Sequence, residues 1–276
     1  MATTTPAPST TMTGSAVTRV LPFGSRHSVH ILERNRFIFR RGWMVIFSGF
    51  FEPLFYLLGI GFGLGSLIGT VAGPDGSQIP YAVFVAPALL ATASMNGAVY
   101  DSTNMFFRLR YEKAYDGMLA TPLNVGDITL GEVIWALGRG ALYGLGFLIV
   151  MFAMGLVPSA TGIFALPASM LIGFATAAAG LVAVTFMRSW QDLDLLFVVT
   201  LPLFLFSGTF FPITTYPEPL RTIVEFSPLY RGVDLVRAMT TGVIGTTQLI
   251  DMIYLFVMGL FFVWVASRRM GRMLLK

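Results

Sequence analysis

The chain has 276 residues, of which 55% are hydrophobic and only 12% are charged. Soluble domains carry about a quarter charged residues, so this composition indicates a polytopic membrane protein. The sequence contains no cysteine, which excludes a disulfide framework, an iron–sulfur cluster and a thiolate zinc site. We interpret the net charge of +4 as a sign of membrane topology rather than of nucleic-acid binding.

The N-terminal region precedes any long apolar run. Residues 1–18 are rich in Thr, Pro and Ser, which predicts a disordered tail, and residues 19–276 are expected to form a single domain. The stretch RHSVHILERNRFIFRRGW mixes basic and apolar residues and predicts an amphipathic helix at the membrane surface. His27 and His30 are interpreted as surface residues, and no metal site is expected.

Six apolar runs reach the roughly 20 residues that a spanning helix needs. The side of the membrane that holds the N-terminus carries most of the Lys and Arg residues, so the positive-inside rule places both termini in the cytoplasm, together with the loop between the second and third runs. The predicted fold class is therefore an all-α membrane protein, with spans at 43–66, 81–107, 132–155, 163–187, 194–213 and 248–267.

The cytoplasmic segment YEKAYDGMLATPL (111–123) is richer in charge and aromatic residues than a simple connector requires. It predicts a helix from Tyr111 to Leu119 that ends before Pro122, and Asp127 is the predicted N-cap of the next span. The segment is either a solvated loop helix or a helix offered to a cytoplasmic partner. In the second interpretation, aromatic and apolar side chains supply contact area and charged ones fix the register, with the candidates being Tyr111, Glu112, Lys113, Tyr115, Asp116, Gly117, Met118 and Leu119.

A second unusual stretch, residues 210–242, follows the fifth run on the outer side. Ser227-Pro228 predicts a helix start, and Leu229, Val233 and Val236 recur at helical spacing. Two short amphipathic helices at the outer membrane surface fit this pattern. They form either an interfacial hairpin or an outer gate.

Charged residues inside the predicted spans are costly unless they are paired or solvated. Glu52, Asp101, Glu132 and Arg139 fall at comparable depths, which predicts an internal cluster, and Glu52 is expected to pair with Arg139. These residues are either structural ion pairs or part of a transport cycle.

Enzymatic motifs are missing from the sequence. The two lysines, Lys113 and Lys276, do not follow a glycine loop, so a phosphate-binding G-x-x-x-x-G-K-[ST] motif is excluded. A G-x-S-x-G nucleophile elbow does not occur either. We therefore expect this chain not to be an enzyme.

Three stretches resemble the type-2 ABC transporter permeases, and in particular the branch that includes nodulation-factor and antibiotic exporters. They are EPLFYLLGIGFGLG (52–65), YEKAYDGMLATPL...GDITLGE (111–132) and PLFLFSGTFFPI...PEPLRTIVEFSPLYRGVDLVR (202–237). The resemblance covers nearly the whole chain after residue 30. The acid before the proline of the first span and the basic residue after the G-E of the third match Glu52 and Arg139.

The resemblance implies a dimer of six-span subunits, formed either by two copies of this chain or by this chain and a close paralogue. The dimer is bound to two separate ATPase subunits, which hold ATP and Mg. The resemblance also implies an N-terminal amphipathic helix, a coupling helix seated in the ATPase between spans 2 and 3, and short re-entrant helices between spans 5 and 6. The charged residues Glu33, Arg34 and Arg36 of the N-terminal helix join the coupling candidates on this basis.

The function expected from these features is ATP-driven export of an amphipathic drug, antibiotic, lipid or glycolipid across the bacterial inner membrane. The path is expected between spans 1, 2 and 5, and its candidate lining residues are Phe50, Phe51, Phe55, Phe204 and Phe206. These phenylalanines could equally face lipid. The alternative function is a proton-coupled secondary carrier that uses Glu52, Asp101 and Arg139.

Overall fold

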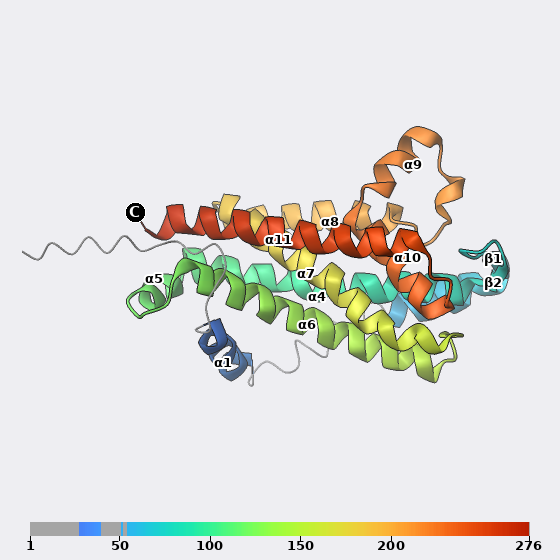
Figure 1. The fold of residues 1–276 in the computed structure, drawn as a ribbon, viewed down its shortest axis with the longest axis horizontal. Helices are drawn as coiled ribbons and strands as arrows, with labels where there is room; N and C mark the ends of the chain where they lie inside the picture. Colours follow the sequence, from blue (N-terminus) through green and yellow to red (C-terminus); the bar gives the residue numbers. More distant parts are fainter. Residues whose placement is uncertain (1–27, 40–50, 52–53, 276) are drawn as a thin grey trace, which may run out of the picture.

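The structure, a computed structural model, describes residues 28–39, 51 and 54–275. The predicted tail at 1–18, Phe50 and Glu52 lie outside the described residues. Long helices run side by side along the longest axis of the molecule, as Figure 1 shows. The elements in chain order are α1 (Ser28–Phe39), η1 (Leu57–Leu64), α3 (Gly65–Ile68), β1 (Thr70–Ala72), β2 (Gln78–Pro80), α4 (Tyr81–Arg110), α5 (Ala114–Leu119), α6 (Val125–Ala153), η2 (Ala160–Phe164), α7 (Ala165–Phe186), η3 (Trp190–Leu193), α8 (Asp194–Phe206), η4 (Ile213–Thr215), α9 (Glu218–Glu225), α10 (Pro228–Thr241) and α11 (Thr246–Leu274).

Within the described ranges, four helices are long and apolar enough to cross a membrane. They are α4, α6, the continuous stretch Ala160–Phe186 and α11. The predicted run at 43–66 lies partly outside the described residues, and the shorter apolar helix Leu54–Ile68 covers its second part. Its centre, η1, is a π-helix that contains three glycines, and such stretches are rare.

The predicted span at 194–213 needs a correction. The helix α8 has 13 residues and ends at Phe206, which makes it about 20 Å long against a hydrocarbon core of about 30 Å. The chain turns at Gly208, whose φ of 70° is the left-handed conformation that glycine adopts without strain. The apolar run in the sequence continues past this turn, which is why hydropathy alone overestimates the helix.

The helix α4 forms the centre of the bundle and packs against α6, α7 and α10. Its contact with α6 depends on small residues, because a Cβ added at Gly140 would lie 2.5 Å from the Ser94 carbonyl oxygen. A Cβ at Gly97 would likewise lie 2.8 Å from the Gly140 Cα. Such small residues let two spanning helices approach closely, and here they bring the polar residues of α4 and α6 together.

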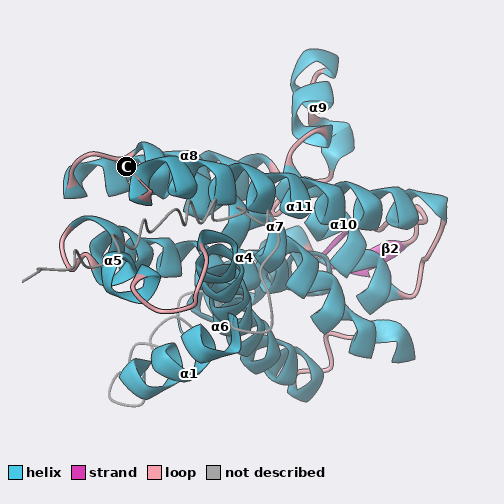
Figure 2. Cartoon of the chain, turned by 60° about the vertical axis from the view of Figure 1, so that its left-hand side comes forward, coloured by secondary structure: helices cyan, strands magenta, loops and turns pink. Residues whose placement is uncertain are grey.

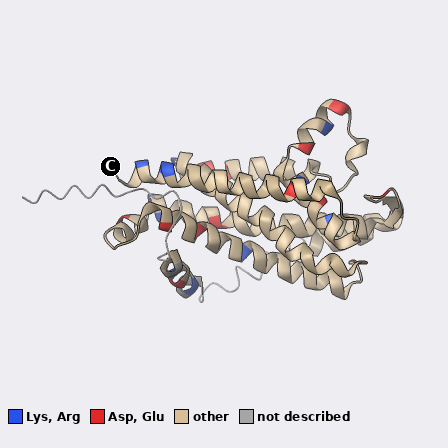
Figure 3. Cartoon of the chain, viewed as in Figure 1, with Lys and Arg blue, Asp and Glu red and all other residues tan. Residues whose placement is uncertain are grey.

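The two ends of the bundle differ in what they carry. The helices α1 and α5 and the C-terminal end of α11 gather at one end, and the β1–β2 hairpin and α10 lie at the other (Figure 1). Both views show α9 projecting from the bundle (Figure 2). Charged residues are concentrated towards the two ends, and the middle of the long helices is mostly uncharged (Figure 3).

The two short helices predicted between the last two runs are present as α9 and α10, and Ser227 caps α10 by accepting a hydrogen bond from the Tyr230 N–H. The predicted surface location needs a correction for α10, because Leu229, Val233 and Val236 are fully buried against α4 and α7. The all-α prediction also missed the small antiparallel β1–β2 hairpin.

Candidate functional site

At the end of the bundle that carries α5, α1 crosses α6 at a glycine. A Cβ added at Gly131 would lie 2.8 Å from the Cβ of Ile31, so glycine allows α1 to rest directly on α6. The next residue, Glu132, is fully buried and accepts a 3.1 Å hydrogen bond from the Asn35 side chain of α1. Gly131 therefore provides the space for α1, and Glu132 accepts the hydrogen bond that holds it.

Glu132 also joins α4 and α5. The Arg108 guanidinium donates to its carboxylate at 2.8 Å, and the Tyr115 hydroxyl donates to its other oxygen at 3.1 Å. Arg108 further donates to the Asn35 side chain at 3.3 Å. One carboxylate thus connects four helices: α1, α4, α5 and α6.

A second carboxylate, Asp101, extends these contacts towards the middle of the bundle. Arg139 of α6 donates to it at 3.2 Å, and Asn104 donates at 3.1 Å. Arg108 lies 3.6 Å from the second Asp101 oxygen and so faces both acids. Among the described residues, two acids and two arginines meet here, and their charges balance, as buried ions require. We call the set Asn35, Asp101, Arg108, Tyr115, Glu132 and Arg139 the charge cluster.

The structure brings together three of the four predicted intramembrane charges: Asp101, Glu132 and Arg139. Glu52 lies outside the described residues, so its pairing with Arg139 stays a prediction. The sequence analysis missed Arg108, because it ended the helix at residue 107 and treated Arg108 as a loop charge. Its seven-residue spacing from Asp101 places both on one helical face and could have revealed it.

The predicted coupling segment is shorter than expected. The helix α5 begins at Ala114 rather than Tyr111, because α4 continues to Arg110 and Lys113 has a left-handed backbone with φ of 48°. The predicted helix end at Leu119 is confirmed. Asp127 is not the N-cap of α6; Asn124 is, and the Asp127 carboxylate accepts a hydrogen bond from its N–H at 3.1 Å.

The role expected for Tyr115 needs a correction. Its side chain is 1% exposed and faces the bundle, so in this chain it supplies no contact area to a partner. Burial, followed by the nearby Glu132 carboxylate, raises the pKa of Tyr115 well above its usual range. The outer face of the segment is formed by other residues: Tyr111, Glu112, Lys113, Asp116 and Gly117 are exposed, and Met118 and Leu119 are half-buried.

The candidate residues on α1 divide in the same way. Glu33 and Arg36 are exposed, and Arg34 is half-buried. Ile31 and Asn35, on the opposite face, are buried against α6. The helix thus has an exposed side and a side that contacts protein, and its predicted place at the membrane surface stays a prediction.

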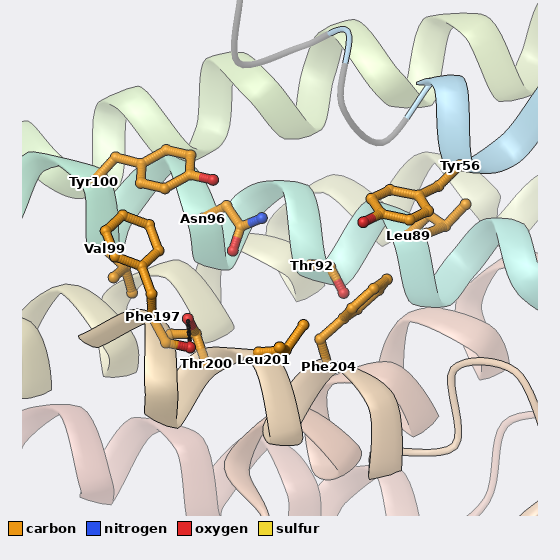
Figure 4. A pocket seen from close by; sticks show the side chains of 10 residues that line it. All are labelled: Tyr56, Leu89, Thr92, Asn96, Val99, Tyr100, Phe197, Thr200, Leu201 and Phe204. Carbon is orange, nitrogen blue, oxygen red and sulfur yellow. Dashed lines mark hydrogen bonds between the residues drawn. The ribbon is translucent and has the colours of Figure 1, made fainter. Parts of the chain in front are cut away.

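A cavity of about 210 Å³ lies between α8, α4 and the helix Leu54–Ile68, which correspond to the predicted spans 5, 2 and 1. Two ring pairs bridge it: Tyr56 with Phe204 at 5.4 Å between centroids, and Tyr100 with Phe197 at 6.0 Å. Figure 4 shows Asn96 projecting from α4 between them. We call this space, lined by Tyr56, Leu89, Thr92, Asn96, Val99, Tyr100, Phe197, Thr200, Leu201 and Phe204, the aromatic cavity.

Of the predicted path residues, Phe204 lines the aromatic cavity. Phe55 is 65% exposed and lies 5.9 Å from Phe51 between ring centroids, outside the cavity lining. Phe206 lies 6.3 Å from Tyr216 and is likewise outside the lining. The sequence analysis selected phenylalanines and missed the tyrosines and Asn96, whose position near the middle of an apolar span was the available signal.

Two further buried charges were missed near the opposite end. Asp251 of α11 is fully buried and accepts a 3.0 Å hydrogen bond from Arg231. Arg237 was treated as an outer loop charge, but it is buried and donates to the backbone carbonyls of Phe84 and Gly208. In the part of the chain that the structure describes, no group of three or more His, Cys, Asp or Glu residues is placed to hold a metal ion.

Together, the long apolar helices of the described ranges indicate a multi-pass membrane protein. The family model described as "ABC-2 type transporter" matches residues 28–240, and the chain belongs to this family. It is accordingly a type-2 ABC permease, which is the transmembrane subunit of such a transporter and not its ATPase.

Several proteins resemble the chain over most of its length. Nodulation protein J of Rhizobium leguminosarum bv. trifolii is 32% identical over 264 residues, which cover 94% of this chain and 98% of that protein. Nodulation protein J of Neorhizobium galegae is 28% identical, with coverage of 93% and 98%. The inner membrane transport permease YadH of Escherichia coli is 25% identical over 60% of this chain and 64% of its own length.

Proposed function

We propose that this chain is the membrane-embedded half of an ATP-driven exporter of amphipathic molecules. Two ABC ATPase subunits, which bind ATP and Mg, drive two permease copies that are surrounded by membrane lipids. The transporter resides in the bacterial plasma membrane with both permease termini in the cytoplasm. Family membership supports the ATPase partnership, and the similarity to YadH, an inner membrane transport permease, supports the inner-membrane location.

The observation that carries the proposal is the two-sided packing of α5. On one side Tyr115 is bonded to Glu132, which also holds α1 and α4. On the other side Asp116 and Gly117 are exposed, and a Cβ added at Gly117 would have no atom within 4 Å. The outer face of α5 is exposed, and its inner face is bonded to other helices through Glu132. A partner that displaces α5 would therefore move several spanning helices with it.

The aromatic cavity supports the transport path, because it lies between the three predicted spans expected to line that path. When α5 moves, α4 moves with it through Arg108 and Glu132, and α4 forms one wall of the cavity. Aromatic rings provide apolar contact area and still tolerate varied ligand shapes, as an amphipathic cargo requires.

The experiment is substrate-stimulated ATPase activity and vesicle uptake with the permease reconstituted beside its ABC ATPase subunit. Glu112→Lys, Asp116→Lys and Gly117→Trp alter the outer face of the segment and are expected to break complex formation or uncouple ATP hydrolysis from transport. The matched control is Gly138→Trp, at a second glycine whose Cβ would have no atom within 4 Å but which lies on α6.

Complex formation and stimulation at unaltered levels in all three outer-face variants would contradict the proposal. Transport that persists with an inactive ATPase and follows the pH gradient would instead support a proton-coupled carrier that uses Glu52, Asp101 and Arg139.

A further inference from the structure

Arginine side chains gather where α7 and α11 end, and Figure 3 shows the basic residues at that end of α11. Arg269 of α11 donates from its Nε to the Thr185 hydroxyl at 2.8 Å, and its guanidinium carbon lies 3.4 Å from the centre of the Phe186 ring. Arg110 of α4 donates to the Met187 carbonyl at 2.7 Å. Both guanidinium groups therefore lie at the C-terminal end of α7.

Two more arginines of α11, Arg268 and Arg272, are exposed at the same end. Within the described ranges, none of these four arginines forms an ion pair with a carboxylate side chain. Outside those ranges the sequence has a single acidic residue, Glu52. This end of the bundle therefore carries positive charge that the described part of the chain leaves unpaired.

The end of α7 accounts for one of these arginines. The last carbonyl groups of a helix attract a cation, and Arg110 meets that need at the Met187 carbonyl. Arg269 instead contacts a hydroxyl and an aromatic ring, which fix its orientation and engage only its Nε. Its two Nη groups make no hydrogen bond within the described ranges, and a guanidinium presented in this way suits a phosphate.

The arginines lie at the level of lipid headgroups. The helix α11 has 29 residues, which make it about 43 Å long against a hydrocarbon core of about 30 Å. Arg268 lies about 33 Å along the helix axis from Thr246, the first residue of α11. The guanidinium carbon of Arg268 is 4.3 Å from the centre of the Trp264 ring, and tryptophan is enriched at the boundary between membrane and water.

An apolar groove begins beside the same arginines. A space of about 560 Å³ lies between α4, α7, α8 and α11, and Phe186 and Met187 are among its lining residues. They are the two residues that Arg269 and Arg110 contact. The lining is mainly apolar and includes Ala183, Leu196, Met258 and Phe262. We call this space the apolar groove.

The groove favours a lipid over a soluble anion or an acidic protein surface, because only a lipid supplies an apolar chain next to a phosphate. Basic pockets between spanning helices bind anionic headgroups in this way. The acidic lining residue Asp192 does not oppose such a ligand strongly. Its carboxylate accepts hydrogen bonds from the N–H groups of Arg188 and Ser189, and the Arg188 side chain offsets its charge.

We propose that this end of the bundle holds an anionic phospholipid as a resident lipid. Its phosphate binds the free Nη groups of Arg269, in the field of Arg110 and Arg268, and one acyl chain passes Phe186 into the apolar groove. The inference goes beyond the proposed function, because the ligand is a component of the membrane that the protein retains and not its cargo.

The test uses the full chain in phosphatidylcholine nanodiscs with a phosphatidylglycerol that carries a diazirine on one acyl chain. Photolysis and peptide mass spectrometry should place adducts at groove residues such as Ala183 and Leu196, in preference to Ile149, which is 58% exposed on α6. Unlabelled phosphatidylglycerol with the same chains should compete about tenfold better than phosphatidylethanolamine. Soluble glycerol 3-phosphate should not compete.

Variants test the arginines one at a time. Arg269→Gln and the exposed Arg268→Gln should each weaken retention of phosphatidylglycerol about fivefold, because one arginine near an anionic surface contributes about that factor. Arg269→Lys keeps the charge but loses the planar fork, so a partial loss is expected. The matched control is Arg221→Gln on α9, which removes the same charge where Glu218 and Glu225 already pair with it, and which should leave labelling unchanged.

Equal labelling at Ala183 and Ile149, insensitive to the headgroup, would overturn the inference, because the groove would then hold ordinary bilayer lipid. Competition by glycerol 3-phosphate would assign the arginines to a soluble phosphate compound and overturn it too. Headgroup selectivity that vanishes when an ABC ATPase subunit is added would assign them to a protein partner, with the same consequence. Headgroup-selective labelling that falls in Arg269→Gln and Arg268→Gln but not in Arg221→Gln would uphold the lipid site.

Discussion

The charge cluster and α8 show two ways of holding a helix in an apolar protein. The charge cluster fastens α1, α4, α5 and α6 through charged and polar contacts between buried side chains. In contrast, α8 has one buried residue, Phe204, and its main contacts among the described elements are with η3 at its start and α10 near its end. One region is held by buried polar contacts between four helices, and the other has few packed neighbours among the described elements.

The largest effect is expected from breaking the central ion pair. Arg108→Ala leaves the fully buried Glu132 without its 2.8 Å partner, and an unpaired buried charge costs about 3–5 kcal/mol. Folded yield and the unfolding temperature of the purified protein should fall sharply. The double variant Arg108→Met/Glu132→Met should recover part of the loss. Additive losses would show that the two side chains do not interact.

A smaller effect is expected at the anchor of α5. Tyr115→Phe removes the hydroxyl that donates to Glu132, and a hydrogen bond to a charged group is worth about 1.5–3 kcal/mol. Tyr111→Phe, on a side chain that is 59% exposed, is the matched control and should be neutral. Thermal unfolding of the two variants measures the difference. A neutral Tyr115→Phe would mean that α5 is not fastened at this point.

The helix contact that positions the charge cluster offers a third test. Gly140→Ala places a methyl group against the Ser94 carbonyl and should cost about 1–3 kcal/mol, because overpacking forces α4 and α6 apart. Gly138→Ala, on the same helix with open space around it, should be neutral or slightly stabilising. Equal unfolding temperatures for the two variants would contradict the close approach of these helices.

The smallest effect is expected at α8. Its backbone amides should exchange with deuterium faster than those of α4, because a helix with few packed neighbours opens at low free energy. Ser207→Ala removes the 2.9 Å hydrogen bond to Ser227 and should speed exchange in α8 while leaving α4 unchanged. Exchange that is equally slow in both helices would remove the contrast between the two regions.

The sequence predicted the order of the long helices, the two short helices before α11, the end of α5 and the grouping of Asp101, Glu132 and Arg139. Each of these depends on apolar run length, local capping or helical spacing, which are local properties. It did not predict that Tyr115 faces inward or that Arg237 is buried. The inward position of Tyr115 depends on its hydrogen bond to Glu132. The burial of Arg237 depends on its hydrogen bond to a backbone carbonyl of α4. No local pattern encodes these partners.

The position of Arg237 has a consequence for biosynthesis. Its guanidinium donates to the carbonyl of Phe84, 153 residues earlier in the chain, and lies 4.0 Å from the centre of the Phe84 ring. At synthesis rates of about 5–20 residues per second, Arg237 is synthesised roughly 8–30 s after that carbonyl. The early helices are therefore inserted before their packing can be completed. The contacts between α10 and α4 form only late in synthesis. During that interval, the nascent chain exposes an incomplete interior to the insertion machinery and to quality-control proteases.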